Sequence, residues 1–173
     1  PAPPPGRERR LSLDEETRLM QAVDAHSNPM LGWIVRIALE TGMRSSEITT
    51  LRRSQVDLKR RIVRLLETKN TLPRTVPLTS AAVDIFRQAL ANPVRPIETD
   101  LIFFGEPGKD GQRRPYNFNK VWLNTKESVG LKDLRFHDLR HEAVSRFVEG
   151  GLSDQQVAVM TQRNLHTQAA NCW

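Results

Sequence analysis

The segment from Met30 to Thr41 constrains the fold most, because its apolar residues return with the spacing of one helical face. The positions that follow this spacing are Leu31, Ile34, Val35, Ala38 and Leu39. Asn28-Pro29 precedes the segment, and Thr41-Gly42 ends it. We therefore expect a helix here that buries one of its faces.

Further helices are expected along the rest of the chain. Ser12 is placed to cap the first of them, and Glu15 stands three residues later, where it completes a capping box. The predicted helical segments are 12–25, 45–51, 80–91, 117–129, 138–150 and a last one that begins after Ser153.

Only a few segments have the pattern of strands. Ile62–Leu66 and Arg74–Leu78 flank a turn and are predicted to form a small hairpin or meander with Lys69 at its tip. Leu101–Phe104 is expected to be a short buried strand or extended segment, and Gly105–Pro115 a polar loop. The predicted fold class is therefore α+β, mainly helical, with a small antiparallel β-sheet.

Length and charge narrow the classes of function. The chain has 173 residues, enough for one well-packed domain, and its 26 Lys and Arg against 20 Asp and Glu leave a net charge of +6. Such a surface attracts polyanions, so nucleic acid is the first candidate partner, although a surplus of this size also occurs on ordinary solvated surfaces. Cys172 is the only cysteine, which excludes an intramolecular disulfide and a cysteine-rich zinc site. No apolar run approaches the roughly 20 residues of a membrane span, so we expect a cytoplasmic protein without a membrane partner.

The first ten residues differ in composition from the rest. They read PAPPPGRERR, a proline-rich stretch followed by basic residues that we expect to stay solvated. We predict that residues 1–10 are a linker joined to a longer chain and that residues 11–173 form the domain, with an atypical or shortened C-terminal end.

The most informative segment for chemistry is Phe136-His-Asp-Leu-Arg-His. A helix that begins here places His137, Arg140 and His141 on neighbouring positions of one face. Arginine offers a planar fork of donors that matches phosphate oxygens, and histidine can donate a hydrogen bond or move a proton near neutral pH. On its own the motif also fits an ordinary surface helix with Leu139 in the core.

Two other segments supply cations. Arg44 follows the Gly42 turn and opens a helix, whose free N–H groups favour an anion, while Glu47 is placed one turn later to orient an arginine. Lys69, at the predicted hairpin tip, can reach and protonate a leaving oxygen. Each of these features is commonplace when it stands alone.

Taken together and in this order, the segments resemble the tyrosine recombinases of the phage-integrase family, shufflon-type recombinases and integrases among them. Leu39-Glu-Thr-Gly-Met-Arg, Glu67-Thr-Lys-Asn and Phe136-His-Asp-Leu-Arg-His-Glu-Ala are close to the wording of that family. The resemblance implies the tyrosine-recombinase catalytic-domain fold and assigns catalytic roles to Arg44, Lys69, His137 and Arg140. It covers nearly the whole chain from Leu11 onward.

The resemblance also implies an activity. Members of the family cut and rejoin double-stranded DNA at specific sites: a tyrosine attacks a phosphodiester, forms a 3′-phosphotyrosyl link and frees a 5′-hydroxyl, without a metal or other cofactor. They assemble as tetramers on DNA, whereas we expect this isolated domain to be monomeric.

The end of the chain departs from the family pattern. Gln162 stands where the family has a histidine or tryptophan, and Asn171 stands where it has the tyrosine. An amide cannot serve as the nucleophile, and Tyr116, the only tyrosine, lies far away in the sequence. The sequence leaves three explanations open: a degenerate recombinase, an altered C-terminal segment, or a chain that ends before the true nucleophile.

Other basic residues are candidates for DNA contacts outside the centre. We predict such contacts for Arg52, Arg53, Arg74, Arg113 and Arg114, with Lys59, Arg60 and Arg61 as further candidates.

Two alternative functions compete with strand exchange. One is a catalytically inactive DNA-binding remnant of the same family. The other is a metal site at His137 and His141, whose spacing is that of helical zinc ligands. Against the metal site, Asp138 replaces the usual glutamate, no third ligand is obvious, and Arg140 places a cation beside the ion.

Overall fold

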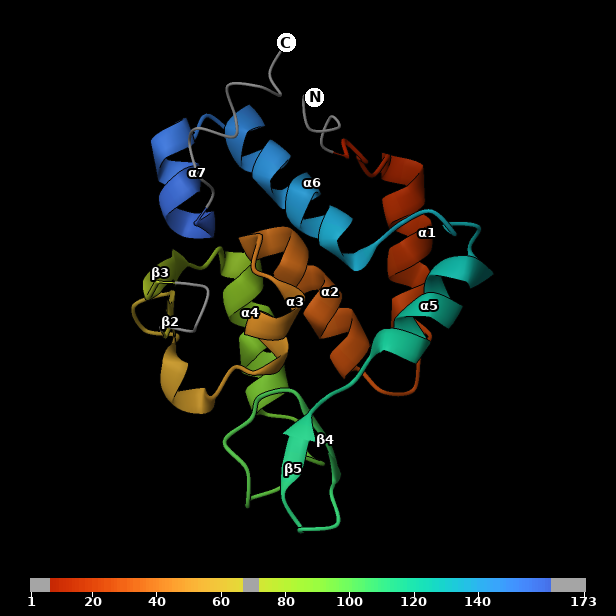
Figure 1. Ribbon diagram of the computed structural model, residues 1–173, viewed down its shortest axis with the longest axis vertical. Coiled ribbons are helices and arrows are strands. Elements are labelled where there is room, and N and C mark those ends of the chain that lie inside the picture. Colours follow the sequence, from red (N-terminus) through yellow and green to blue (C-terminus); the bar gives the residue numbers. More distant parts are fainter. Residues whose placement is uncertain (1–6, 67–71, 163–173) are drawn as a thin grey trace, which may run out of the picture.

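The computed structural model describes residues 7–66 and 72–162 and is mainly helical (Figure 1). Its helices are α1 (Leu13–Asp24), α2 (Met30–Thr41), α3 (Ser45–Thr49), α4 (Ser80–Leu90), α5 (Asn119–Ser128), α6 (Phe136–Glu149) and α7 (Asp154–Thr161), with a 3-10 turn at Arg53–Gln55. Its strands are β1 (Val56–Asp57), β2 (Ile62–Leu65), β3 (Arg74–Pro77), β4 (Phe104–Pro107) and β5 (Arg113–Pro115). The predicted class, α+β with a small antiparallel sheet, is confirmed.

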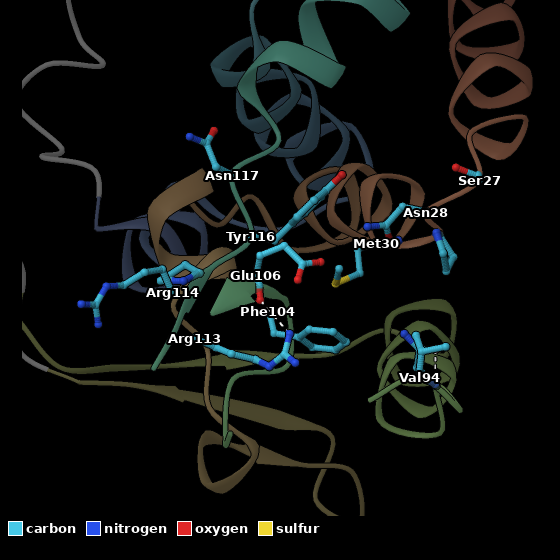
Figure 2. A pocket seen from close by; sticks show the side chains of 14 residues that line it. Ser27, Asn28, Met30, Val94, Phe104, Glu106, Arg113, Arg114, Tyr116 and Asn117 are labelled. Atoms are coloured by element: carbon cyan, nitrogen blue, oxygen red, sulfur yellow. Dashed lines mark hydrogen bonds between the residues drawn. The ribbon is translucent and has the colours of Figure 1, made fainter. Parts of the chain in front are cut away.

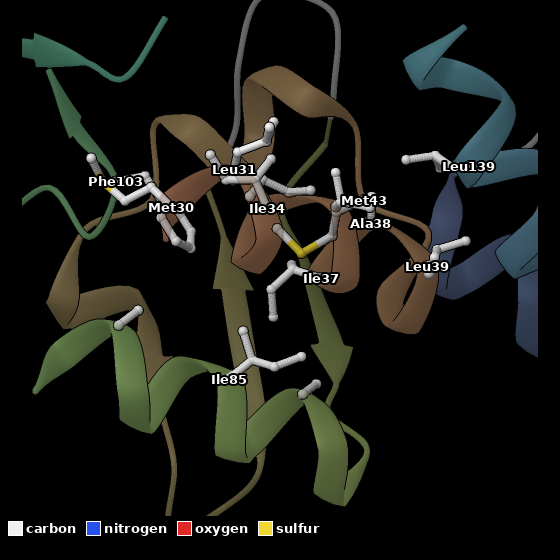
Figure 3. Packing of buried hydrophobic residues seen from close by; sticks show 14 of the residues in the cluster. Met30, Leu31, Ile34, Ile37, Ala38, Leu39, Met43, Ile85, Phe103 and Leu139 are labelled. Atoms are coloured by element: carbon white, nitrogen blue, oxygen red, sulfur yellow. The ribbon is translucent and has the colours of Figure 1, made fainter. Parts of the chain in front are cut away.

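Helix α2 forms the centre of the core, as its spacing predicts. Ile34, Val35 and Ala38 are fully buried, and the helix packs against α4 on one side and α6 on the other (Figure 3). Burying a Val, Leu or Ile side chain contributes about 1.5–3 kcal/mol each, so this one helix supplies much of the driving force for folding. It ends at Gly42, whose φ of 66° lies in the left-handed region where an L side chain is strained.

The capping signals in the sequence are confirmed at two helices. The Ser12 hydroxyl accepts from the Glu15 N–H at 3.2 Å, and the Glu15 carboxylate accepts from the Ser12 N–H at 3.0 Å. Ser153 and Gln156 form the same reciprocal pair at the start of α7. These bonds satisfy N–H groups that have no partner inside the helix.

The predicted hairpin is confirmed and belongs to a sheet of order β1-β2-β3. Strands β2 and β3 are antiparallel with Val63 opposite Val76. The sequence reasoning missed β1, because a strand of only two residues has no period to detect. The described chain resumes at Leu72, so Lys69 lies outside the described residues.

The prediction of a polar loop at Gly105–Pro115 was wrong. Strands β4 and β5 pair in antiparallel fashion across this segment, with Pro107 opposite Arg113. Gly111 has a φ of 75° and lets the chain reverse, while the Gly108 N–H donates to the Gln112 carbonyl at 2.8 Å. Asp110-Gly111 was the available hairpin signal.

The basic residues before α1 were predicted to stay solvated, and Arg7 and Arg10 are exposed while Arg9 is half-buried. Arg7, Arg9 and Arg10 form ion pairs with carboxylates near the start of α1 and on and before α6. Composition favours solvated charge, but folding brings acidic partners from the other end of the chain. The division into residues 1–10 and 11–173 stays a prediction.

Candidate functional site

Helix α6 presents the predicted histidine and arginine side chains on one face. It begins at Phe136 because the Asp138 carboxylate accepts from the Arg135 N–H at 2.8 Å. The rings of His137 and His141 lie edge to face with centroids 4.9 Å apart, and helical spacing puts Arg140 on the same face. His137 is exposed, whereas Arg140 retains only 6% of its accessible surface.

Arg140 joins α6 to the ends of two other helices. Its guanidinium donates to the Gly42 carbonyl at 2.6 Å and also to the Thr161 carbonyl. A Cβ built at Gly42 would lie at ordinary contact distances, 3.5 Å from the Thr161 methyl and 3.7 Å from the Ala143 Cβ, so the position favours glycine for its positive φ and not for lack of space. The buried arginine is therefore held in one orientation by backbone atoms at both ends of its fork.

Arg44 opens α3 and is oriented by Glu47, as predicted. The Glu47 carboxylate accepts from the Arg44 N–H at 2.8 Å and from the Arg44 guanidinium at 3.0 Å. The Arg44 side chain remains 34% exposed, so it can reach a ligand in solution.

Arg74, predicted as a DNA contact, is buried beside Glu47, the carboxylate that orients Arg44. Its guanidinium donates two bonds of 2.8 Å to the Glu47 carboxylate and a third of 2.8 Å to the Met160 carbonyl. Its side chain is only 4% exposed. Burial by itself raises the pKa of Glu47, but hydrogen bonds from Arg74 and Arg44 outweigh it and lower that pKa.

The sequence carried a signal for this burial. In a strand alternate residues share a face, so Arg74 points the same way as the fully buried Val76. Its geometry favours a role in holding the site together, and its contact with DNA stays a prediction.

The last turn of α7 is held by arginines. The Met160 carbonyl accepts from Arg74 and the Thr161 carbonyl from Arg140, which places cations at the negative end of the helix. Gln162 then adopts a left-handed conformation with a φ of 52° and donates through its amide to the Leu72 carbonyl. Gln162 therefore joins the end of α7 to the chain just before β3, while Asn171 lies outside the described residues.

The remaining predicted contacts lie away from this cluster. The β4–β5 hairpin sits at the end of the molecule opposite α6 and α7 (Figure 1). Arg113 pairs with Glu98 at 2.9 Å and lies over the Phe104 ring, and Arg114 pairs with Asp110 at 2.7 Å.

Two hollows run along this end of the molecule. Arg113, Arg114 and Tyr116 line a cavity of about 720 Å³ (Figure 2). Arg52 and Arg113 share a second one of about 450 Å³. A shallower groove connects the first turn of α3, at Ser45 and Ser46, with the chain that follows β5.

The other basic candidates are exposed. Arg53 follows Arg52 into the 3-10 turn, and Lys59, Arg60 and Arg61 lie on the turn between β1 and β2. The guanidinium of Arg61 donates to the Ser80 hydroxyl at 3.2 Å.

Two absences apply to the part of the chain that the structure describes. Across residues 7–66 and 72–162, no group of three or more His, Cys, Asp or Glu side chains is arranged to hold a metal ion. Within those same ranges, no helix is both long and apolar enough to cross a membrane.

Comparison with known sequences finds relatives that are integrases and recombinases. A model described as "Phage integrase family" matches residues 9–164. A shufflon-specific DNA recombinase of Escherichia coli is 36% identical over 157 residues, which are 90% of this chain and 37% of that protein. The integrase of Salmonella phage P22 is 29% identical over 160 residues, 88% of this chain and 40% of that protein. The chain thus spans well under half the length of these relatives.

Comparison with solved structures gives the same fold. The crystal structure of XerA recombinase has a TM-score of 0.75 at 21% identity and covers 98% of this chain and 60% of that one. The catalytic domain of bacteriophage HP1 integrase has a TM-score of 0.68 at 24% identity and covers 94% of this chain and 84% of that one. These likenesses confirm the predicted catalytic-domain fold.

Proposed function

The chain belongs to the phage integrase family, and from that premise we propose that it binds double-stranded DNA as the catalytic domain of a site-specific tyrosine recombinase whose nucleophile is missing. One observation carries the proposal. Hydrogen bonds gather Arg44, Arg74 and Arg140, which are far apart in the sequence, around the α2–α3 junction and the end of α7. A cluster of guanidinium groups on a face with two histidines suits a DNA phosphate.

We assign different roles to the members of this cluster. Arg44 is partly exposed and oriented by Glu47, so it binds one oxygen of the phosphate. Arg140 binds another from a position fixed by the Gly42 and Thr161 carbonyls. His137, exposed on the same face of α6, donates a hydrogen bond or transfers a proton. Fixed cationic donors of this kind stabilise the charge that develops on a pentavalent phosphorus.

The strand-breaking step needs two groups that lie outside the described residues. In the proposed step a tyrosine hydroxyl gives its proton to His137 and its oxygen forms a bond to phosphorus. The bond from phosphorus to the 5′-oxygen breaks, and Lys69 gives the 5′-oxygen a proton. Asn171 occupies the tyrosine position, and its amide cannot attack. Tyr116 is no substitute, since burial raises the pKa of its hydroxyl and makes the phenolate harder to form.

The test restores the missing groups. The chain as written and the variant Asn171→Tyr with Gln162→His are incubated with a pool of nicked suicide duplexes and run on a denaturing gel. We expect a covalent protein–DNA band from the variant alone, and none when Arg140→Gln is added to it. A variant that binds DNA but forms no adduct would overturn the proposed catalytic role of the cluster.

The second candidate function is that of an inactive DNA-binding remnant, which Asn171 and Gln162 favour. It predicts salt-dependent binding by the chain as written, in which each phosphate contact contributes about 0.9 to the slope of log K against log salt. Fluorescence anisotropy with a labelled duplex measures that slope, and absence of binding would contradict both candidates.

For the DNA-free domain we propose a monomer, and for longer relatives on DNA we propose a tetramer. Sedimentation of the free domain tests the first proposal.

A further inference from the structure

Helix α6 carries charged groups on a second face, away from His137 and Arg140. Asp138, Glu142 and Glu149 recur at intervals that keep them along one side of the helix. Asp138 is 3% exposed and Glu142 is 2% exposed, which is unusual for carboxylates. The chain just before α1 runs beside this side of α6 (Figure 1).

Arg10 and the backbone after it satisfy the buried carboxylate of Glu142. The Arg10 guanidinium donates to Glu142 through Nε at 2.9 Å and Nη2 at 3.1 Å, and through Nη1 to Glu149 at 2.7 Å. The Leu11 N–H donates to Glu142 at 2.9 Å, and Arg146 donates to it at 3.0 Å. The carboxylate therefore accepts from three residues, two of which belong to the segment that precedes α1.

Arg7 pairs with Asp138, the acidic residue at the start of α6. Its Nε lies 3.1 Å from one Asp138 oxygen, and its Nη2 lies 3.1 Å from the other while also bonding to the Asp133 carbonyl. The same carboxylate caps α6 through the Arg135 N–H. Arg7 therefore contacts the first turn of α6. Arg10 contacts two positions further along the helix, Glu142 and Glu149, which lie two turns apart.

These contacts determine where α6 lies. A carboxylate buried without donors is strongly disfavoured, so Glu142 stays in place only while α6 keeps its position and rotation relative to residues 7–11. Asp138 follows His137 directly, and Glu142 follows Arg140 by two positions, so a rotation of the helix that breaks the acidic contacts also moves the catalytic face.

We infer that Arg7 and Arg10, with Asp138, Glu142 and Glu149, form an arginine latch that positions α6, and that these arginines are positioning residues and not DNA contacts. The inference rests on the proposed function for its DNA readout. The basic stretch before the domain is then an element of the site, although it touches no substrate.

The test compares Arg10→Gln, Glu142→Gln and the double variant with Arg87→Gln. Arg87 is a matched control, because it is an exposed arginine paired with Asp84 at 3.1 Å on α4, far from the latch. DNA affinity is measured by anisotropy over a range of salt, and the imidazole signals of His137 and His141 are followed by NMR.

We expect Arg10→Gln to weaken DNA binding about tenfold at fixed salt while the salt slope stays the same, and to shift the His137 signals. Glu142→Gln and the double variant should give a similar loss, because both changes break one unit. Arg87→Gln should change neither affinity nor imidazole signals.

Several results would overturn the latch. A fall in slope of about 0.9 for Arg10→Gln would make Arg10 a phosphate contact. Affinity and imidazole signals equal to those of Arg87→Gln would remove the positioning role. If Glu142→Gln unfolds, the exposed Arg10 still decides the question. If the chain binds no DNA at all, the proposed function fails, and the imidazole shifts alone confirm or reject the latch.

Discussion

The ion pair between Glu47 and Arg74 allows a direct estimate of what holds the site together. The change is Glu47→Gln, which keeps the shape of the side chain and removes its charge. Glu47 is 12% exposed and Arg74 is 4% exposed, and the change leaves the buried Arg74 guanidinium without its counter-ion. Removing one partner of a buried pair costs about 3–5 kcal/mol.

The structure places the cost near the lower end of that range. Arg74 keeps its bond of 2.8 Å to the Met160 carbonyl, and the glutamine oxygen can still accept one of the two bonds that Arg74 donates to Glu47. We therefore expect a loss of about 3 kcal/mol, and at about 2–4 °C per kcal/mol for a chain of this size the melting temperature should fall by roughly 6–12 °C.

The assay is urea unfolding followed by circular dichroism, with calorimetry for the melting temperature. Asp84→Asn is the matched control, because it makes the same chemical change in an ion pair whose side chains are 65% and 66% exposed. Exposed pairs contribute little, so the control should unfold at the same urea concentration as the parent. A loss below about 1 kcal/mol for Glu47→Gln would refute the argument that this pair is a buried, coupled contact.

Two further perturbations test other parts of the structure. Burial raises the pKa of Glu142, but bonds from Arg10, Leu11 and Arg146 outweigh it and lower the pKa to about 2. Since the unfolded value is near 4.5, this carboxylate contributes about 3 kcal/mol above that pH, and the contribution is lost as pH falls from about 4.5 to about 2. Between pH 6 and pH 3 the parent should lose about 2 kcal/mol more than Glu142→Gln in urea unfolding, because pH 3 lies about 1.5 pH units below the unfolded value. Other carboxylates with a lowered pKa, Glu15 among them, affect both proteins alike, and equal losses would contradict the role of Glu142. Gly42→Ala should cost about 1 kcal/mol from its φ of 66° alone, because a Cβ there meets neighbours at ordinary contact distances. Gly111→Ala, with a φ of 75° and open space around it, should lose the same amount in urea unfolding, and a loss above 3 kcal/mol at Gly42 alone would show tighter packing than the structure has.

Features with local causes could be predicted from the sequence. The cap at Ser12, the buried face of α2 and the stop at Gly42 each depend on residues within a few positions of one another, and all are present. The β4–β5 hairpin was missed because its strands are short and polar, so their pattern resembles that of a loop. The dipeptide Asp110-Gly111 is typical of a hairpin turn and predicts a strand on either side of it.

The site could be predicted only as a set of residues, since its connections run between distant segments. Arg44, His137 and Arg140 could be proposed because their motifs are local, and Glu47 was expected to orient an arginine. That its main partner is Arg74, and that Arg74 also holds the end of α7, depends on how β3 packs against α3 and α7. A net charge counted from the sequence takes every arginine to be a solvated cation. The free energy of a buried arginine is set instead by the hydrogen-bond acceptors that folding brings to it.

The arginines of the domain fall into two functional kinds. Arg44 keeps an exposed guanidinium beside a single carboxylate, so a phosphate can join it at little cost in lost contacts. Arg74 and Arg10 already donate to buried or partly buried acceptors, and a phosphate would have to displace bonds that hold β3 or α6 in place. Apart from Arg140, which the Gly42 and Thr161 carbonyls hold in the proposed phosphate site, the arginines that bind DNA should therefore be those with the fewest internal acceptors. The positive charge of the sequence overstates the DNA-binding surface of this domain.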